Sequence, residues 1–484
     1  MITARTKLGL EMVAVALALG VLGDALLRAV PWGLNITLGV TTVVGLTWLL
    51  VRRHGIVPSA DAPWLALTAL LLGVAFVRRD AQVLASFDAM ALIATLGLGA
   101  LSLQGERIAP LRALDYLHRG ATAVAGTVAG GLQLVFQDVQ WNELSKEGRW
   151  RQARAVALGA VIAVPLLVVF GALFASADEV FGNVLKNVFA FDAETALSHT
   201  FLTIFCAAVA AGYLRWSLIA RPGAATLPIA GASLGIVPVA TALGLVTLLF
   251  LMFVVVQLRY FFGGATLVEQ TTGLTYAEYA RRGFFELVTA SGLVLPMLLG
   301  ADHLVRGAQP AHLRLFRSLA GVLLVLLAVV MASALGRMRL YVQAFGLSEI
   351  RLYATAFMVY LFGVFGWFAA TVLRGQHGRF AFGALIQGYA VLAGLHVINS
   401  DAFIVRTNLH RVATVAERPF DTKYALSLGA DAVPRLLEAL PTLPERDRCD
   451  VAAGLLKKWG ENEARPDGDW RGWNWSRART RRLV

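Results

Sequence analysis

The hydrophobic positions of this chain fall into long, uninterrupted runs. Runs near the ~20 residues that cross a ~30 Å hydrocarbon layer recur eleven times. They are Leu8–Val30, Trp32–Val51, Pro63–Val77, Gln82–Leu103, Ala155–Ala175, Leu197–Ile219, Ile236–Leu258, Gly283–Gly300, Leu315–Leu335, Leu352–Leu373 and Phe380–Asn399. Because the runs lack the alternation of barrel strands and spanning backbone must satisfy its own hydrogen bonds, each predicts a transmembrane helix. The pattern predicts an all-α polytopic bundle of about eleven spans, possibly twelve.

One further stretch, Gly120–Phe136, is apolar but short and rich in glycine. If it does not cross, the segments on the N-terminal side hold 18 Lys and Arg residues, and the loops opposite hold 10. If it crosses, the two sides hold 14 each. Since positive residues concentrate on the cytoplasmic side, the first arrangement is favoured. It predicts a cytoplasmic N-terminus, an extracytoplasmic C-terminal tail, and an interfacial or re-entrant position for this stretch.

Polar segments divide the chain into four parts. These are a four-span segment (1–103), a basic interfacial segment (104–154), a seven-span core (155–399) and a small soluble helical tail (400–484). In the tail, Thr442 and Glu445 flank Pro444 in the pattern of a capping box, which predicts a helix near Leu443–Trp459. A second helix is predicted at Asp431–Leu440.

Composition agrees with a lipid environment. Of the residues, 57% are hydrophobic and only 15% are charged, so water cannot be the main solvent of this surface. The net charge of +12 would suggest nucleic acid in a soluble protein, but here the charges flank apolar runs and act as topology signals. We therefore expect the lipid bilayer as a partner and no nucleic acid. Scarce lysine beside abundant arginine, alanine and glycine is typical of a bacterial protein, and the inner membrane is the expected location.

The least generic polar sequence lies between the ninth and tenth runs. It contains the candidate ligand-binding residues Arg337, Arg339, Tyr341, Glu349, Arg351 and Tyr353. Arginine presents a planar fork that suits phosphate or carboxylate, whereas tyrosine belongs at a bilayer interface for its shape alone. Two interpretations stay open: a collar of snorkelling side chains with an internal pair from Glu349 to Arg339 or Arg351, or a site for an anion or lipid headgroup.

Two ionisable residues lie within apolar runs. Asp88 is the deepest carboxylate by position, and His396 lies near the end of the last run. Charge at membrane depth costs ~3 kcal/mol or more, so each group needs a partner or a function. A structural pair and a role in binding protons or ions are both open for Asp88, and a structural role is favoured for His396.

The sequence contains no motif that indicates a catalytic site. Gly231–Gly235 fits the pattern G-x-S-x-G, but no strand precedes it, and the same spacing serves helix packing. Neither a P-loop nor an H-E-x-x-H motif occurs, the eight histidines are scattered, and there are only two cysteines. We therefore expect no cofactor and no metal, and a non-enzymatic role is favoured.

Several stretches resemble an uncharacterised family of bacterial polytopic membrane proteins, the domain of unknown function 4173. They are Arg337–Tyr353, Val254–Gly264, Tyr276–Glu286, Asn399–Asn408, Tyr424–Pro434 and Trp473–Arg477, with departures at Phe345, Ser348 and Ser400. The resemblance implies a polytopic membrane protein and no particular activity.

Three functional hypotheses follow. The first is a membrane protein that binds or moves an envelope-related or lipid-like ligand at its extracytoplasmic face. The second is a membrane-embedded transferase acting on a lipid-linked substrate. The third is an accessory or sensory subunit whose tail binds a protein partner. Substrate, partner and oligomeric state do not follow from the sequence.

Overall fold

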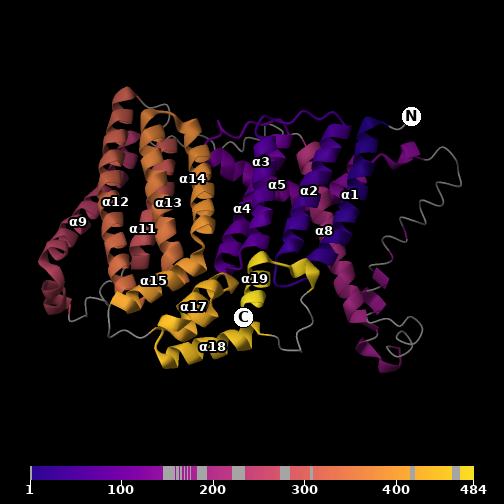
Figure 1. Cartoon of the computed structure of the whole chain (residues 1–484). Coiled ribbons are helices and arrows are strands. Elements are labelled where there is room, and N and C mark those ends of the chain that lie inside the picture. The colour runs from indigo at the N-terminus through magenta and orange to yellow at the C-terminus, as the bar shows by residue number, and fades with distance from the viewer. Residues whose placement is uncertain are drawn as a thin grey trace.

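A computed structural model describes residues 3–144, 193–220, 235–272, 284–305, 309–414, 420–460 and 469–484, with isolated positions between 159 and 181. The described residues form helices and no strand. A row of upright helices makes the bundle, and the tail packs beneath it (Figure 1). The bundle contains α1 (Ala4–Leu27), α2 (Leu34–Arg53), α3 (Ala62–Arg78), α4 (Gln82–Leu103), α5 (Ala113–Gln133), α8 (Ala193–Leu218), α9 (Ile236–Thr272), α11 (Phe284–Leu304), α12 (Pro310–Phe345), α13 (Glu349–Thr371) and α14 (His377–Ile398).

Nine helices of the described part are long and apolar enough to cross a membrane: α1, α2, α4, α8, α9, α11, α12, α13 and α14. The helix α3 is shorter, as its run predicts. Ten of the eleven predicted runs therefore form helices, and the eleventh, Ala155–Ala175, lies largely outside the described residues. The all-α polytopic bundle predicted from the hydrophobic pattern is confirmed.

The helices pack in two groups. The first joins α1 and α2 to α3, α4 and α8, and the second joins α9 and α11 to α12, α13 and α14. Leu84 and Leu92 on α4 meet Leu392 and Leu395 on α14 in a buried cluster that connects the groups. The ionisable residues Asp88 of α4 and His396 of α14 lie along this contact.

The helix α5 begins and ends on the same face of the bundle. Before it, the amide of Ile108 donates to Asp61 at the start of α3 (2.7 Å). After it, the buried Asp138 accepts from Arg5 at the start of α1 and from Arg215 at the end of α8, both at 2.5 Å. Since these partners share the face that carries the N-terminus, α5 does not cross the bundle, in agreement with the charge count.

Close packing holds α5 against α8. A Cβ added to Gly212 of α8 would lie 1.8 Å from the carbonyl oxygen of Thr127, and one added to Gly130 of α5 would lie 3.1 Å from the Cα of Gly212. Only glycine allows these two backbones to approach so closely.

The tail consists of α15 (Ser400–Thr414), α16 (Thr422–Ser427), α17 (Val433–Ala439), α18 (Glu445–Trp459) and α19 (Trp475–Leu483). The two predicted tail helices appear as α17 and α18, but the predicted capping box is wrong. The hydroxyl of Thr442 donates instead to the carbonyl of Ala439, and Pro444 occupies the N-cap without a side-chain bond. The short turn of 3-10 helix at Leu440–Thr442 explains this difference, because it directs Thr442 back toward α17.

The tail has its own apolar core, which reaches the bundle. Ile404 and Val405 on α15 pack with Leu436 on α17 and with Leu347 and Leu352 at the start of α13. The tail face of the bundle lies opposite the face that carries the N-terminus (Figure 1). The tail is therefore packed against the ends of the membrane helices.

Candidate functional site

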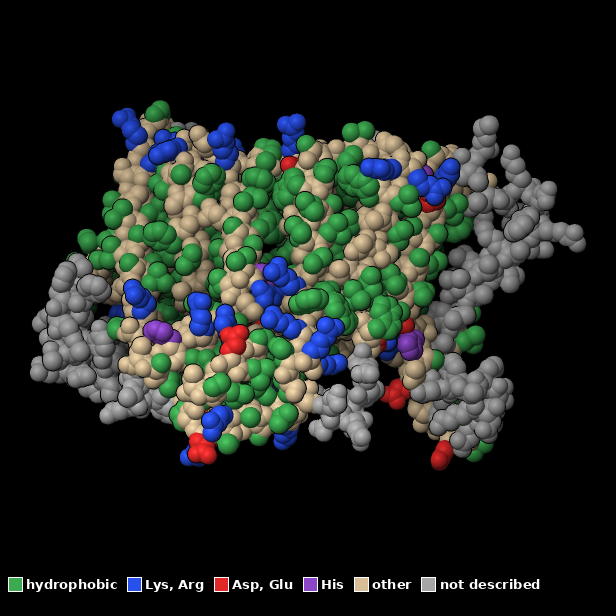
Figure 2. Space-filling view, viewed as in Figure 1, with side chains coloured by type: hydrophobic (Ala, Val, Ile, Leu, Met, Phe, Trp, Pro, Cys, Tyr) green, Lys and Arg blue, Asp and Glu red, His purple; other side chains and the backbone are tan. Residues whose placement is uncertain are grey.

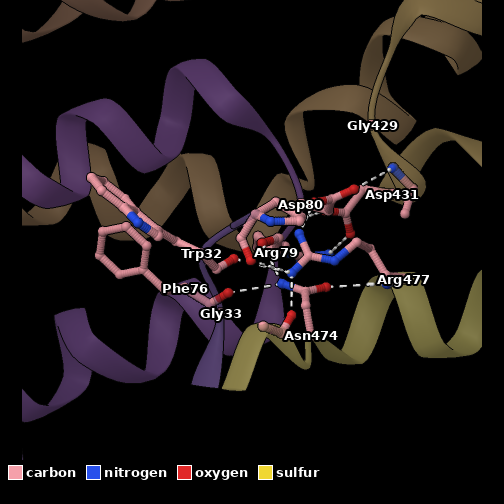
Figure 3. Close-up of polar contacts among 12 residues, drawn as sticks. Trp32, Gly33, Phe76, Arg79, Asp80, Gly429, Asp431, Asn474 and Arg477 are labelled. Atoms are coloured by element: carbon pink, nitrogen blue, oxygen red, sulfur yellow. Dashed lines mark hydrogen bonds and ion pairs between the residues drawn. The ribbon is translucent and has the colours of Figure 1, made fainter. Parts of the chain in front are cut away.

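The short loop between α3 and α4 is bound by the tail through Asp80 (Figure 3). One carboxylate oxygen of Asp80 accepts from Arg477 of α19 (2.6 Å), and the other accepts from the amide of Ala430 (3.1 Å). The amide of Asp80 donates to the carboxylate of Asp431 (2.6 Å). A single loop residue thus contacts two separate parts of the tail.

Arg79 connects this loop with the last turn of α14. Its guanidinium pairs with Asp431 at 3.1 Å and also donates to the main-chain carbonyl of His396 at 2.5 Å. The Arg79 side chain is only 14% exposed. Because the charge is largely removed from water, its position depends on both partners.

Asn474 and Arg477 fix the start of α19 to two loops of the bundle. The amide nitrogen of Asn474 donates to the carbonyls of Phe76 and Arg79 at the end of α3, both at 2.8 Å. Arg477 also donates to the carbonyl of Trp32 (3.1 Å), in the loop between α1 and α2. Both residues lie in the stretch Trp473–Arg477, to which the sequence assigned no role, although an Asn directly before a helix is a recognisable cap signal. We call Arg79, Asp80, Asp431, Asn474 and Arg477 the junction network.

Two adjoining cavities open beside the junction network, with volumes of about 310 and 270 Å³. They share Asn399, Asp431, Pro434 and Arg479 in their walls. Five arginines line one or both of them: Arg78, Arg79, Arg406, Arg435 and Arg479. Basic side chains gather where the bundle meets the tail (Figure 2). We call this pair of cavities the basic cleft.

The basic cleft carries an excess of positive charge. Arg79 pairs with Asp431, and Arg435 pairs with Glu438 at 2.6 Å. Arg78, Arg406 and Arg479 are exposed and form no ion pair with any residue that the structure describes. The arrangement suits a planar anion such as phosphate, because the guanidinium fork can donate two bonds to it.

Asp88 and His396, far apart in the sequence, meet between α4 and α14. Nε2 of His396 lies 2.9 Å from Oδ1 of Asp88. The Asp88 side chain is 2% exposed and that of His396 is 14% exposed. Nδ1 of His396 is buried without a hydrogen-bond partner among the described residues. The two ionisable candidates from the sequence thus form one buried pair.

The six candidates between Arg337 and Tyr353 do not form one site. Here α12 continues past its apolar run to Phe345 and ends at Gly346, whose φ of 81° favours glycine. The guanidinium of Arg351 lies 4.0 Å from the ring centre of Tyr341 and donates to the carbonyl of Phe345 (3.3 Å). Arg339 is exposed on the surface of α12, and Arg337 is half-buried on the same helix.

On α13 the remaining two candidates have separate surroundings. The amide of Glu349 donates to the hydroxyl of Tyr424 in the tail (2.8 Å), and the Glu349 carboxylate forms no ion pair with Arg339 or Arg351. Tyr353 is buried against α4, in the cluster that contains Leu84. The segment therefore connects α12 with α13 and contacts the tail at Tyr424, while Tyr353 is close enough to Asp88 to interact with it electrostatically.

A second carboxylate of the tail, Asp401 on α15, is buried next to the junction network. It accepts a hydrogen bond from the amide of Gly429 (2.9 Å). Burial, together with the negative charges of Glu349, Asp431 and Asp80, raises the pKa of Asp401 to about 7. This carboxyl therefore changes its protonation state near neutral pH.

Fold and site together define the class of this chain: a polytopic helical membrane protein with a docked tail and a basic cleft at the level of its helix ends. Within the described residues, no group of three or more His, Cys, Asp or Glu side chains could hold a metal ion.

The family follows from a comparison of the sequence with family models. The model described as Domain of unknown function (DUF4153) matches residues 66–439, and the chain belongs to this family. The expected resemblance to domain 4173 is not confirmed. No curated protein and no solved structure matches the chain. The match includes Asp80 and Asp431 but ends before Asn474 and Arg477.

Proposed function

We propose that this protein binds an anionic phospholipid, with the headgroup in the basic cleft and without chemical conversion. The observation that carries the proposal is the set of three exposed arginines, Arg78, Arg406 and Arg479, that line the two cavities and have no acidic partner in the described structure. Volumes of about 310 and 270 Å³ suit a headgroup better than a whole lipid.

The position of the cleft along the membrane helices supports a lipid ligand rather than a fully water-soluble anion. Arg78 is the last residue of α3, and Asn399 directly follows α14, so the cleft lies where the spanning helices end. Val397, which lines the larger cavity, is 78% exposed on the surface of α14. Acyl chains can lie along this apolar surface while the phosphate reaches the arginines, as in other basic pockets at membrane interfaces.

An aromatic residue at the edge of the cleft also supports a position of the cleft at the membrane interface. Trp475 lines the smaller cavity and is 58% exposed. Tryptophan is enriched where a bilayer meets water. By the distribution of Lys and Arg, this face is extracytoplasmic, so the proposed ligand belongs to the outer leaflet of the inner membrane.

The test is a titration with a short-chain lipid in detergent. Dioctanoyl phosphatidylglycerol should bind, whereas dioctanoyl phosphatidylcholine, whose headgroup has no net charge, should bind much more weakly. The double variant Arg78→Gln and Arg479→Gln should weaken binding by about 30-fold, at about 1 kcal/mol for each interfacial arginine.

The matched control removes the same charge elsewhere on the tail. Arg446 and Arg448 are exposed on α18 and line neither cavity. The double variant Arg446→Gln and Arg448→Gln should bind phosphatidylglycerol like the unmodified protein. Equal weakening by both double variants would show that only the overall charge of the tail matters, and it would overturn the proposed site.

A further inference from the structure

We infer that the pair formed by Asp88 and His396 is a proton-binding site, and that its occupancy is linked to the anion in the basic cleft. The inference rests on the proposed function and adds a second ligand to it, the proton. It concerns two side chains that the lipid itself does not touch, since neither lines the cleft.

The geometry of the pair provides a place for one added proton. With Nε2–H of His396 donating to Asp88, Nδ1 keeps a lone pair that no described residue uses. A proton taken up at Nδ1 converts the ring to an imidazolium, which then forms an ion pair with Asp88 over 2.9 Å. A buried charge is tolerated best when an opposite charge is already in contact with it.

Arg79 connects this proton site to the cleft. Its guanidinium lines the smaller cavity, and it donates to the main-chain carbonyl of His396 itself. With the cleft empty, Asp431 offsets Arg79, but Arg78 and Arg479 beside it have no acidic partner among the described residues, so the net positive charge opposes a further positive charge on the imidazole. A phosphate in the cleft offsets this net charge and so favours the imidazolium. Anion binding and proton binding therefore support one another.

Other charged or titratable groups lie near Asp88 and His396. On α13, the hydroxyl of Tyr353 is close enough to interact electrostatically with Asp88. On the tail side, Asp431 pairs with Arg79, and Asp401 interacts with Tyr353. Because Asp401 titrates near neutral pH, it is the competing explanation for any dependence of binding on pH.

The experiment is calorimetry with dioctanoyl phosphatidylglycerol in two buffers of different ionisation enthalpy, between pH 6 and pH 8. The phosphodiester keeps its charge throughout this range, so a difference between the buffers reports protons taken up by the protein. We expect net proton uptake on binding and an affinity roughly tenfold higher at pH 6 than at pH 8.

Two variants remove the proton site by different routes. Asp88→Asn and His396→Gln should each still bind the lipid, but without proton uptake and without the difference between pH 6 and pH 8. If one of the two does not fold, the other decides the question. Persistence of proton uptake in either folded variant would overturn the inference.

Two matched controls separate the alternatives. His377 lies 3.2 Å from Asp302 on the opposite face of the bundle, so His377→Gln removes the same kind of pair and should leave the linkage intact. Asp401→Asn should also leave it intact, and loss of proton uptake in that variant would assign the proton to Asp401 and overturn the inference. Lipid binding without proton uptake in the unmodified protein overturns this inference alone, whereas no binding of phosphatidylglycerol overturns the proposed function as well.

Discussion

The substitution Asn474→Asp tests whether the junction network holds the tail on the bundle. It exchanges the amide nitrogen for an oxygen and leaves the shape of the side chain unchanged. In the structure this nitrogen donates to the carbonyls of Phe76 and Arg79, both at 2.8 Å, and the residue is 1% exposed. The variant therefore loses two buried hydrogen bonds and places a carboxylate oxygen against two carbonyl oxygens.

The magnitude follows from these contacts. Each hydrogen bond contributes about 1 kcal/mol, and the unsatisfied buried carboxylate costs about 1 kcal/mol more, for a total of about 3 kcal/mol. At 1.36 kcal/mol for each factor of ten, the undocked state of the tail becomes roughly 150-fold more populated. The bundle cores do not contain Asn474 and should remain folded.

Hydrogen exchange measured by mass spectrometry is the appropriate assay. Two amides report on docking: that of Leu34, which donates to the carbonyl of Trp473, and that of Asp80, which donates to the carboxylate of Asp431. Peptides containing them should exchange roughly 150-fold faster in the variant. The control Arg481→Gln lowers the net charge by the same unit within α19 and should leave exchange unchanged. A change below threefold in Asn474→Asp would refute the assignment of the network as the attachment of the tail.

Three further predictions concern other parts of the molecule. The pKa of Asp401 is raised to about 7 from an ordinary 3.8, so the folded protein holds this proton more tightly than the unfolded chain does. The stability that the proton contributes is complete below about pH 4 and is lost as the pH rises through about 7. The melting temperature should therefore fall from pH 5 to pH 8, and it should fall less in Asp401→Asn. In intact spheroplasts a membrane-impermeant maleimide should label the exposed Cys449, with Cys449→Ser as the control, while Cys206 within α8 stays unlabelled; labelling only after permeabilisation would place the tail in the cytoplasm. Gly212→Ala should lower the free energy of unfolding by about 1–3 kcal/mol, because the added methyl group meets the backbone of α5. Gly244→Ala places its methyl group in open space and should not lower it. Equal thermal stability of the two variants in detergent would contradict the close packing.

The membrane helices were predictable because their signal is local. A run of about 20 apolar residues must form a helix in lipid whatever its neighbours do, so each run could be recognised separately. The position of α5 also followed from the sequence, since the distribution of arginines constrains all later segments together. The ends of helices were less predictable: α12 continues to Phe345 because its last turns pack against the tail, and hydropathy does not report that contact.

The candidate site was predictable only in part, because its residues come from distant segments. Asp88 and His396 were each recognisable as unusual, yet their 2.9 Å contact depends on how α4 packs against α14. Arg78 and Arg79 resemble any pair of arginines that ends a membrane helix. Both line the cleft together with Asp431, which pairs with Arg79 and lies more than 350 residues later in the chain. The dense cluster at Arg337–Tyr353 attracted attention by composition, but local density of polar residues does not show which of them share a cavity.

The attachment of the loop after α3 to α19 also sets an order of events during synthesis. Asp80 and Arg477 are separated by 397 positions. At about 5–20 residues per second, the loop waits roughly 20–80 s after translation before its arginine partner exists. During this interval the first four helices are inserted in lipid while Asp80 has no partner from the tail. A chain that ends before Arg477 therefore leaves Asp80 without its tail partner, whereas the completed protein has the two residues paired.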